Sequence, residues 1–326
     1  MVISAPGTET GAAKRRRPTA LRGHRVLPIP AVLWLAILFL APVGILLSTS
    51  FLSYEGPDVV LDPNLGNYSA LFSDSHFLRI LWSTVWTSLA VAFICAVMAY
   101  PVAHFLVRSN SRFRVLVVVL VLSPMVASVV VRTYGWLVLL EKDGLISQVL
   151  EGTGIHDGPT GLRGTYAAII IGLVHVLLPF SVFTTMSSLQ AVNPSLEQAA
   201  RDLGAGPVRT FFRVTLPLSL PGVTAGAILV FAICLGAFAT PSVLGGGRVQ
   251  TLATLVQEAM ITTGEWARAA SVAAVILALG LSVILVLSWS ARLTSRGGRP
   301  GGGRSWLSPP AGGCGPAASS RPPCCR

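Results

Sequence analysis

Residues 80–107 read ILWSTVWTSLAVAFICAVMAYPVAHFLV, a stretch of 28 residues without a charged side chain that lies between Arg79 and Arg108. About 20 apolar residues in a helix cross the roughly 30 Å hydrocarbon core of a bilayer. Inside hydrocarbon, every backbone N–H and C=O must be paired within the protein, so an isolated run of this kind forms a helix rather than a strand. The stretch therefore predicts a membrane-spanning helix.

Five further apolar runs predict five further spans. They cover residues 26–54, 115–140, 164–196, 214–247 and 269–291, and the second of them is interrupted by Arg132. The whole chain of 326 residues is 52% apolar and 11% charged, whereas about a quarter of the residues in a soluble domain are charged. We expect an all-α integral membrane protein with six transmembrane helices, in which 26–54 is the first helix and 77–293 is a core of five.

The charged residues predict the orientation of these spans. The net charge is +11, which in a soluble chain would suggest a nucleic-acid partner. With the N-terminus inside, the inner segments sum to +15 and the outer segments to −5, as the positive-inside rule requires. The charge therefore indicates topology, with both termini cytoplasmic and no nucleic acid bound. The basic segment 1–25 and the Gly/Pro-rich tail 294–326 are predicted to be disordered.

The inner loop between the fourth and fifth spans has a helical pattern of its own. It reads NPSLEQAARDLGAGPVRTFFRVTLPLSLPG over residues 193–222. Ser195 with Gln198 three residues later predicts a capping box at a helix start, and Gly204 predicts a left-handed helix end. Taken alone, this short polar helix is equally consistent with an interfacial connector.

A second short helix is predicted to follow in the same loop. Pro207 stands at a first-turn position, which proline tolerates because that turn needs no intrahelical N–H bond. Pro217 is expected to break this helix at about Thr215, where the chain returns to the membrane.

This loop resembles the EAA loop of permease subunits from binding-protein-dependent ABC importers. That loop has Glu-Ala-Ala, three residues, Gly, nine residues, Ile, one residue and Leu-Pro. The residues that match this spacing are Ala199, Ala200, Gly204, Val214, Leu216 and Pro217. The chain departs from the pattern at Gln198, which replaces the glutamate and follows Glu197, and at Val214, which replaces the isoleucine.

The resemblance extends over residues 81–293. Over this range the chain is similar to the spermidine/putrescine-type branch of these permeases. It is carried by YPVAHFLVRS (100–109), VVRTYGWLVLL (130–140), LVHVLLPFSVFTTMSSL (173–189), SLEQAARDLGA (195–205), FFRVTLPLSLPGV (211–223) and FATPSVLGGG (238–247). It implies a bacterial plasma-membrane importer with a second, different permease, two copies of a cytoplasmic ATPase and an extracytoplasmic binding protein. By resemblance, the ATPase docks on Glu197, Gln198, Ala199, Ala200, Arg201, Asp202 and Gly204, and ATP-driven closure moves this helix.

The sequence predicts that the chain itself is not an enzyme and holds no cofactor or metal. A P-loop needs Gly-Lys-Ser/Thr after a glycine-rich turn. The only lysines are Lys14 and Lys142, and neither follows a glycine or precedes a serine or threonine. The five cysteines lack the spacing and the nearby histidines of a zinc site. ATP hydrolysis therefore belongs to a separate polypeptide.

Polar and aromatic side chains within the spans are candidates for the solute pathway. These candidates are Arg132, Tyr134, Trp136, His175 and Glu258. An intramembrane charge such as Arg132 is a functional candidate, but a straight helix from Arg114 would place it near the outer interface, in a structural or gating role. The aromatic residues are more typical of an interfacial belt, and His175 is more typical of a buried histidine that forms a hydrogen bond to a neighbouring helix. Gly172, Gly222, Gly226 and Gly236 indicate close helix packing.

Several functions remain open at this point. An ion-coupled secondary transporter would show paired charges at mid-membrane and an inverted repeat, and neither is visible. The solute is expected to be a polyamine, with opines, amino-acid derivatives and iron as alternatives.

Overall fold

The computed structural model describes residues 29–55, 58–63, 65–109, 111–152 and 161–296. The predicted segment 1–25 and all but the first three residues of the predicted tail 294–326 lie outside them. In chain order the elements are α1 (Ile29–Ser50), β1 (Leu52–Glu55), β2 (Asp58–Pro63), α2 (Gly66–Ser73), α3 (Ser75–Arg108), α4 (Phe113–Val126), α5 (Val129–Leu140), α6 (Leu145–Gly152), α7 (Tyr166–Ala191), α8 (Pro194–Asp202), α9 (Pro207–Thr210), a π-helical turn (Phe211–Thr215), α10 (Leu216–Leu235), α11 (Ala239–Leu244), α12 (Leu252–Gln257), a second π-helical turn (Glu258–Thr263) and α13 (Trp266–Arg296).

The predicted class, a helical membrane protein, is confirmed. Within the described residues, five helices are long and apolar enough to cross a membrane, and six if α4 and α5 together make one broken span. A short antiparallel hairpin of β1 and β2 follows α1. The first helix accordingly ends at Ser50, before the predicted boundary at residue 54.

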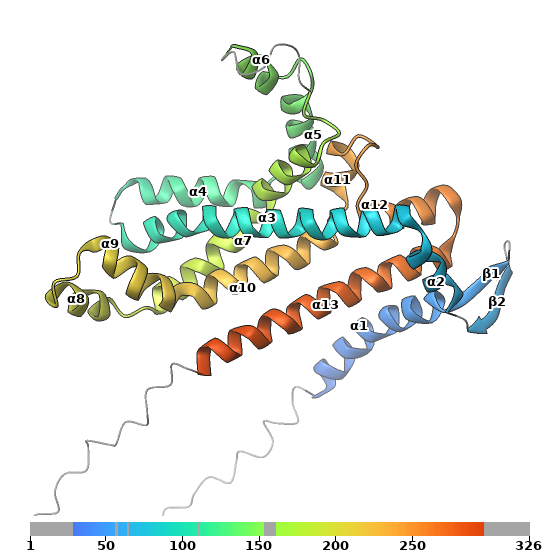
Figure 1. Ribbon diagram of the computed structural model, residues 1–326, viewed down its shortest axis with the longest axis horizontal. Helices are drawn as coiled ribbons and strands as arrows, with labels where there is room; N and C mark the ends of the chain where they lie inside the picture. Colours follow the sequence, from blue (N-terminus) through green and yellow to red (C-terminus); the bar gives the residue numbers. More distant parts are fainter. Residues whose placement is uncertain (1–28, 56–57, 64, 110, 153–160, 297–326) are drawn as a thin grey trace, which may run out of the picture.

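The third predicted span is broken rather than straight. α4 and α5 meet at 104°, because Ala127 and Ser128 between them have extended backbone angles. Pro124 lies three residues before the break, where it removes a backbone donor from the helix. α5 leaves the direction of the bundle and packs on α11 (Figure 1). The expectation that placed Arg132 by a straight helical rise from Arg114 is therefore wrong.

Three long helices, α3, α7 and α10, pack together to form the centre of the bundle. α10 lies close to α7 because its residues at the contact are glycines. A Cβ on Gly222 would lie 2.7 Å from the Thr184 carbonyl oxygen, and a Cβ on Gly226 would contact the Thr184 hydroxyl. Small residues allow this approach, and van der Waals packing holds membrane helices together since lipid is as apolar as leucine. Within the described residues, no atom outside its own stretch of chain lies within 4 Å of a Cβ built on Gly236, so this chain shows no close packing at that predicted position.

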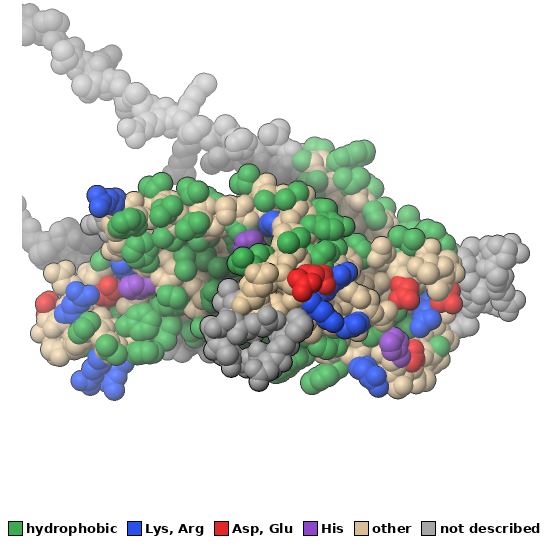
Figure 2. Space-filling model, turned by 90° about the horizontal axis from the view of Figure 1, so that it is seen from above, with side chains coloured by type: hydrophobic (Ala, Val, Ile, Leu, Met, Phe, Trp, Pro, Cys, Tyr) green, Lys and Arg blue, Asp and Glu red, His purple; other side chains and the backbone are tan. Residues whose placement is uncertain are grey.

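The two ends of the bundle carry different elements. Figure 1 shows the start of α1, the end of α13, α8 and α9 at one end, and α2, the hairpin, α11 and α12 at the other. We call these the α8 end and the α2 end. Figure 2 shows hydrophobic side chains along much of the body, with charged side chains towards the ends and around the projecting α5–α6 region.

The close approach of α10 to α7 makes a testable prediction. Gly222→Ala is expected to destabilise the protein by about 1–3 kcal/mol, since the added methyl group overpacks a backbone contact. The matched control is Gly236→Ala, which meets open space. Thermal unfolding of the purified protein in detergent measures both, and equal melting temperatures for the two variants would contradict the packing.

Candidate functional site

The N-cap of the short helix α8 lies two residues before the predicted one. Asn193 is the N-cap, and its side-chain oxygen accepts a hydrogen bond from the Ser195 N–H at 3.0 Å. Pro194 occupies the first helical position, where its missing N–H costs nothing. The predicted capping box from Ser195 to Gln198 is therefore wrong, because the Asn-Pro pair already starts the helix.

The end of α8 is confirmed as a glycine-terminated turn. Gly204 has φ of +83°, a left-handed conformation that strains residues with a Cβ. Its N–H donates to the Arg201 carbonyl at 2.9 Å, and the Ala205 N–H donates to the Ala200 carbonyl at 3.0 Å. These two bonds are those of a Schellman motif, so the backbone turn is well defined.

The outer face of α8 is exposed and partly apolar. Most of the predicted docking residues are exposed: Gln198, Ala199, Arg201, Asp202 and Gly204, with Ala200 half-buried. Leu203 at the helix end is 89% exposed and Val208 on α9 is 68% exposed. Large apolar side chains exposed at a helical tip outside the spans indicate an interaction surface. We call Gln198, Ala199 and Leu203 the docking face.

Glu197 is turned away from this face. Its carboxylate accepts from the Arg108 guanidinium on α3 at 2.7 Å and from the Thr215 hydroxyl at 3.0 Å. The Glu197 side chain is only 15% exposed. The structure therefore separates Glu197 from the other predicted docking residues.

The return to the membrane is continuous rather than broken at Pro217. The chain from Pro207 to Leu235 forms one long helix, in which Phe211–Thr215 is a π-helical turn and the Leu216 N–H donates to the Phe211 carbonyl. Pro217 stands in the first turn after it. The wider turn shifts the bonding pattern just ahead of the proline, so the predicted break is wrong. Val214 is half-buried in the turn.

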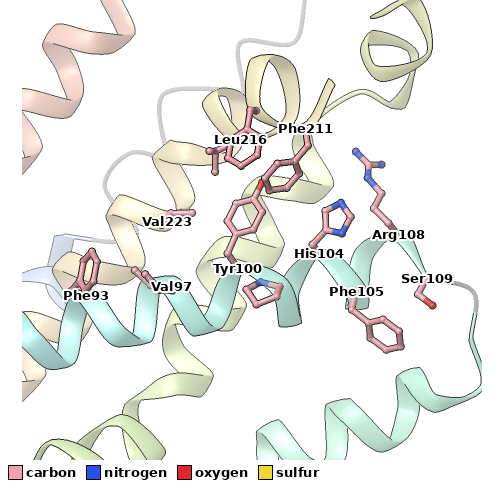
Figure 3. Close-up of a pocket in the computed structure, with 13 residues that line it drawn as sticks. Phe93, Val97, Tyr100, His104, Phe105, Arg108, Ser109, Phe211, Leu216 and Val223 are labelled. Carbon is pink, nitrogen blue, oxygen red and sulfur yellow. The ribbon is translucent and has the colours of Figure 1, made fainter. Parts of the chain in front are cut away.

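A cavity of about 990 Å³ lies beside this turn, between α3 and α10. Its wall contains Tyr100, His104 and Arg108, which are spaced four residues apart on one face of α3 and point together with Phe211 (Figure 3). The Phe211 ring packs edge-on against Tyr100 at 5.4 Å between centroids. The cavity is aromatic and apolar over most of its wall, with a basic group at one end.

The predicted pathway residues divide into two places. The Trp136 indole N–H donates to Nδ1 of His175 at 3.1 Å, which joins α5 to α7. Arg132 is half-buried and donates from Nε to the Ser128 carbonyl, while Tyr134 is 54% exposed. Among the described residues, no hydrogen bond or ion pair joins Glu258 to Arg132, Tyr134, Trp136 or His175.

Glu258 lies at the α2 end, at the start of the second π-helical turn. Its carboxylate accepts a hydrogen bond from the Gln250 amide at 2.9 Å, and the Gln250 oxygen in turn contacts His76 at 3.2 Å. A pocket of about 220 Å³ opens there. The residues around it are Pro241, Ser242, Gly247, Val249, Gln250, Thr254, Gln257, Glu258, Ile261 and Thr262.

Sequence reasoning missed the groups that hold α8 in place. From the sequence, Arg108 is only the charged residue that ends an apolar run, and Tyr100, Thr215 and Ser219 are not site candidates. The four-residue spacing of Tyr100, His104 and Arg108 is a usable signal that they share one helix face. For the described residues, no group of three or more His, Cys, Asp or Glu side chains converges as a metal site would require.

Comparison with known families identifies the architecture. Residues 25–296 match the family described as the binding-protein-dependent transport system inner membrane component. The chain belongs to this family. It is thus the permease component of an ABC importer, and its relatives are transport subunits rather than enzymes.

Individual relatives and solved structures agree with this assignment. The permease is 32% identical to the spermidine/putrescine transport system permease protein PotB of Haemophilus influenzae, over 78% of this chain and 87% of that one. The corresponding protein of Escherichia coli K12 is 30% identical, over 79% and 94%. A bacterial alginate ABC transporter, solved in complex with its alginate-bound periplasmic protein, matches the fold with a TM-score of 0.69 at 18% identity, over 83% of this chain and 94% of that chain.

The backbone of Gly204 gives the second prediction. Gly204→Val is expected to distort the end of α8 at a cost of about 1–2 kcal/mol, and to lower the amount of solute taken up per ATP hydrolysed in the reconstituted importer. Gly204→Asn is the control, since asparagine tolerates the left-handed conformation. No atom lies within 4 Å of a Cβ here, so the difference between the variants reports backbone strain. Full coupling in the Gly204→Val variant would contradict this role.

Proposed function

We propose that this permease forms, with a second and different permease, the membrane pathway for a polyamine such as spermidine or putrescine. An extracytoplasmic binding protein delivers the solute, and two copies of a cytoplasmic ATPase supply the energy. The main support for this proposal is the similarity of about four fifths of this chain to two permeases named for spermidine and putrescine. The similarity covers nearly the whole length of each relative, so it includes the pathway as well as the loop.

The proposed orientation places the α8 end in the cytoplasm. Both ends of the described chain and α8 lie at this end of the bundle (Figure 1). The inner segments, including α8, carry +15 when the N-terminus is taken as inside. Positive segments remain cytoplasmic, so this orientation presents the docking face to a cytoplasmic ATPase and leaves the α2 end outside.

The proposed cargo agrees with the chemistry at the α2 end. Among the described residues that line its pocket, Glu258 is the only charged one, and the other polar groups are neutral amides and hydroxyls. No ion-pair partner of Glu258 is found in the part of the chain that the structure describes. A carboxylate with neutral acceptors around it attracts an ammonium group and repels an oxyanion.

A second cargo class has one supporting observation. The permease is also 32% identical to the molybdenum transport system permease protein ModB of Mycobacterium bovis, over 58% of this chain and 70% of that one. The match covers less of this chain than the PotB matches do. The negative pocket at Glu258 favours the cationic cargo.

The docking face gives a prediction for the ATPase. Leu203→Ser is expected to reduce co-purification of the ATPase with the permease, because it removes the most exposed apolar contact at the tip of α8. Leu65→Ser is the matched control, since Leu65 is 68% exposed at the opposite end. Pull-down of the co-expressed complex in detergent measures both. Equal ATPase recovery from the two variants would show that α8 is not the docking site.

The pocket at Glu258 gives a prediction for the cargo. Glu258→Gln is expected to lower the maximal rate of spermidine uptake about threefold, since one exposed charge contact is worth up to about 1 kcal/mol. Glu265→Gln is the control at the same end, because that carboxylate already pairs with Arg268 at 3.3 Å. Uptake of labelled spermidine into vesicles with the complete importer measures the rates. Absence of uptake in the unmodified importer would overturn the polyamine assignment and leave the permease family unaffected.

A further inference from the structure

Side chains from three helices connect α8 to the bundle through the carboxylate of Glu197. The Arg108 guanidinium on α3 reaches it at 2.7 Å. The Thr215 hydroxyl, at the end of the π-helical turn, reaches the same oxygen at 3.0 Å. One carboxylate oxygen therefore joins α8 to both the end of α3 and the start of α10.

The connection continues from Thr215 back to α3. The Ser219 hydroxyl donates to the Thr215 carbonyl at 2.8 Å and lies 3.0 Å from the Tyr100 hydroxyl. Tyr100 and Arg108 are two turns apart on α3. The five residues Arg108, Glu197, Thr215, Ser219 and Tyr100 thus form a closed ring through α3, α8 and α10, which we call the latch.

The burial of the latch distinguishes it from an ordinary surface ion pair. The side chains of Arg108 and Glu197 are 23% and 15% exposed, and Ser219 is fully buried. Arg108 Nε is buried without a hydrogen-bond partner in the described residues, so the guanidinium depends on Glu197 for compensation. Removing one member of a buried pair leaves an uncompensated charge, which makes separation of α8 from α3 unfavourable.

The latch also reaches the wall of the large cavity. Tyr100 belongs both to the latch and to that wall. Phe211 opens the same π-helical turn that Thr215 closes, and its ring contacts Tyr100 and His104 (Figure 3). A displacement of α8 that keeps the latch intact must therefore move this aromatic wall.

We propose that Glu197 is a positioning residue for energy coupling: through Arg108 and Thr215 it makes α8 move as one body with the aromatic wall of the cavity. The proposal rests on docking of an ATPase to α8. It assigns different roles to adjacent residues, since Gln198 faces the ATPase and Glu197 transmits its movement. The proposal does not depend on which solute is transported.

The test follows the cavity wall directly. Val97 lines the cavity and is 56% exposed, so Val97→Cys introduces a reporter thiol. The tail cysteines 314, 324 and 325 are replaced by serine, and the buried Cys95 and Cys234 are retained. The complete importer is labelled with a maleimide, with and without ATP and vanadate to trap the closed ATPase. We expect trapping to change the labelling rate at least about threefold in this background.

Two substitutions weaken the latch to different extents while sparing the docking face. In Glu197→Gln we expect the ATPase to co-purify normally and the ratio of labelling rates with and without trapping to fall from about threefold to about one, within the range by which single residues alter coupling. Thr215→Val removes one hydroxyl and should give a smaller loss, and Thr215→Ser should restore the response. A purely structural role would not distinguish valine from serine in this way while ATPase binding is normal.

A double-mutant cycle determines whether Glu197 acts through Arg108. If it does, Arg108→Gln combined with Glu197→Gln will be no worse than the more severe single variant, because both remove one interaction. Multiplying effects, loss of ATPase binding in Glu197→Gln, or an unchanged labelling response would each overturn the proposal. Labelling requires no transported solute, so failure of spermidine uptake in the unmodified importer would count against the cargo alone.

Discussion

Backbone hydrogen bonding in the absence of water is the constraint on which this structure depends. Long apolar segments can satisfy it only as helices, and that is why α3, α7, α10 and α13 run for 20 residues or more. The departures from regular helix then become informative. At the π-helical turn the Thr215 carbonyl accepts from the Ser219 hydroxyl, and at the bend between α4 and α5 the Ser128 carbonyl accepts from Nε of Arg132, so side chains bond backbone groups at both irregular places.

Close packing in the centre follows from the same environment. Helices in lipid gain little from burying leucine, so contact depends on shape. Gly222 and Gly226 allow α10 to approach α7. Because the two helices are close, the Ser188 hydroxyl on α7 donates to the Ser219 carbonyl on α10 at 3.2 Å. Ser219 is also part of the latch. The glycines that bring α10 to α7 therefore also help to hold the group that links α10 to α3.

The sequence predicts the long helices and the short helix α8 because their signals are local. Uncharged runs, the spacing from Ala199 to Pro217 and the left-handed Gly204 depend on residues close together in the chain. The hydrogen bond of Trp136 with His175 joins residues 39 positions apart, and the pairing of Arg108 with Glu197 joins residues 89 positions apart. One sequence contains no direct signal for such pairs, so it shows Arg108 only as the charge that ends an apolar run, although Arg108 is the partner that turns Glu197 inward.

Adjacent positions on α8 show why a motif match alone does not assign roles. Successive residues of an α-helix are rotated by about 100°, so Glu197 and Gln198 face different directions. The family pattern places its glutamate at position 198, where this chain presents a neutral amide to the exterior. The charge stands one position earlier, where it stabilises Arg108. The proposed docking face is consequently formed by an amide and apolar groups, including Leu203, and Glu197 is directed to the permease itself while Asp202 remains exposed.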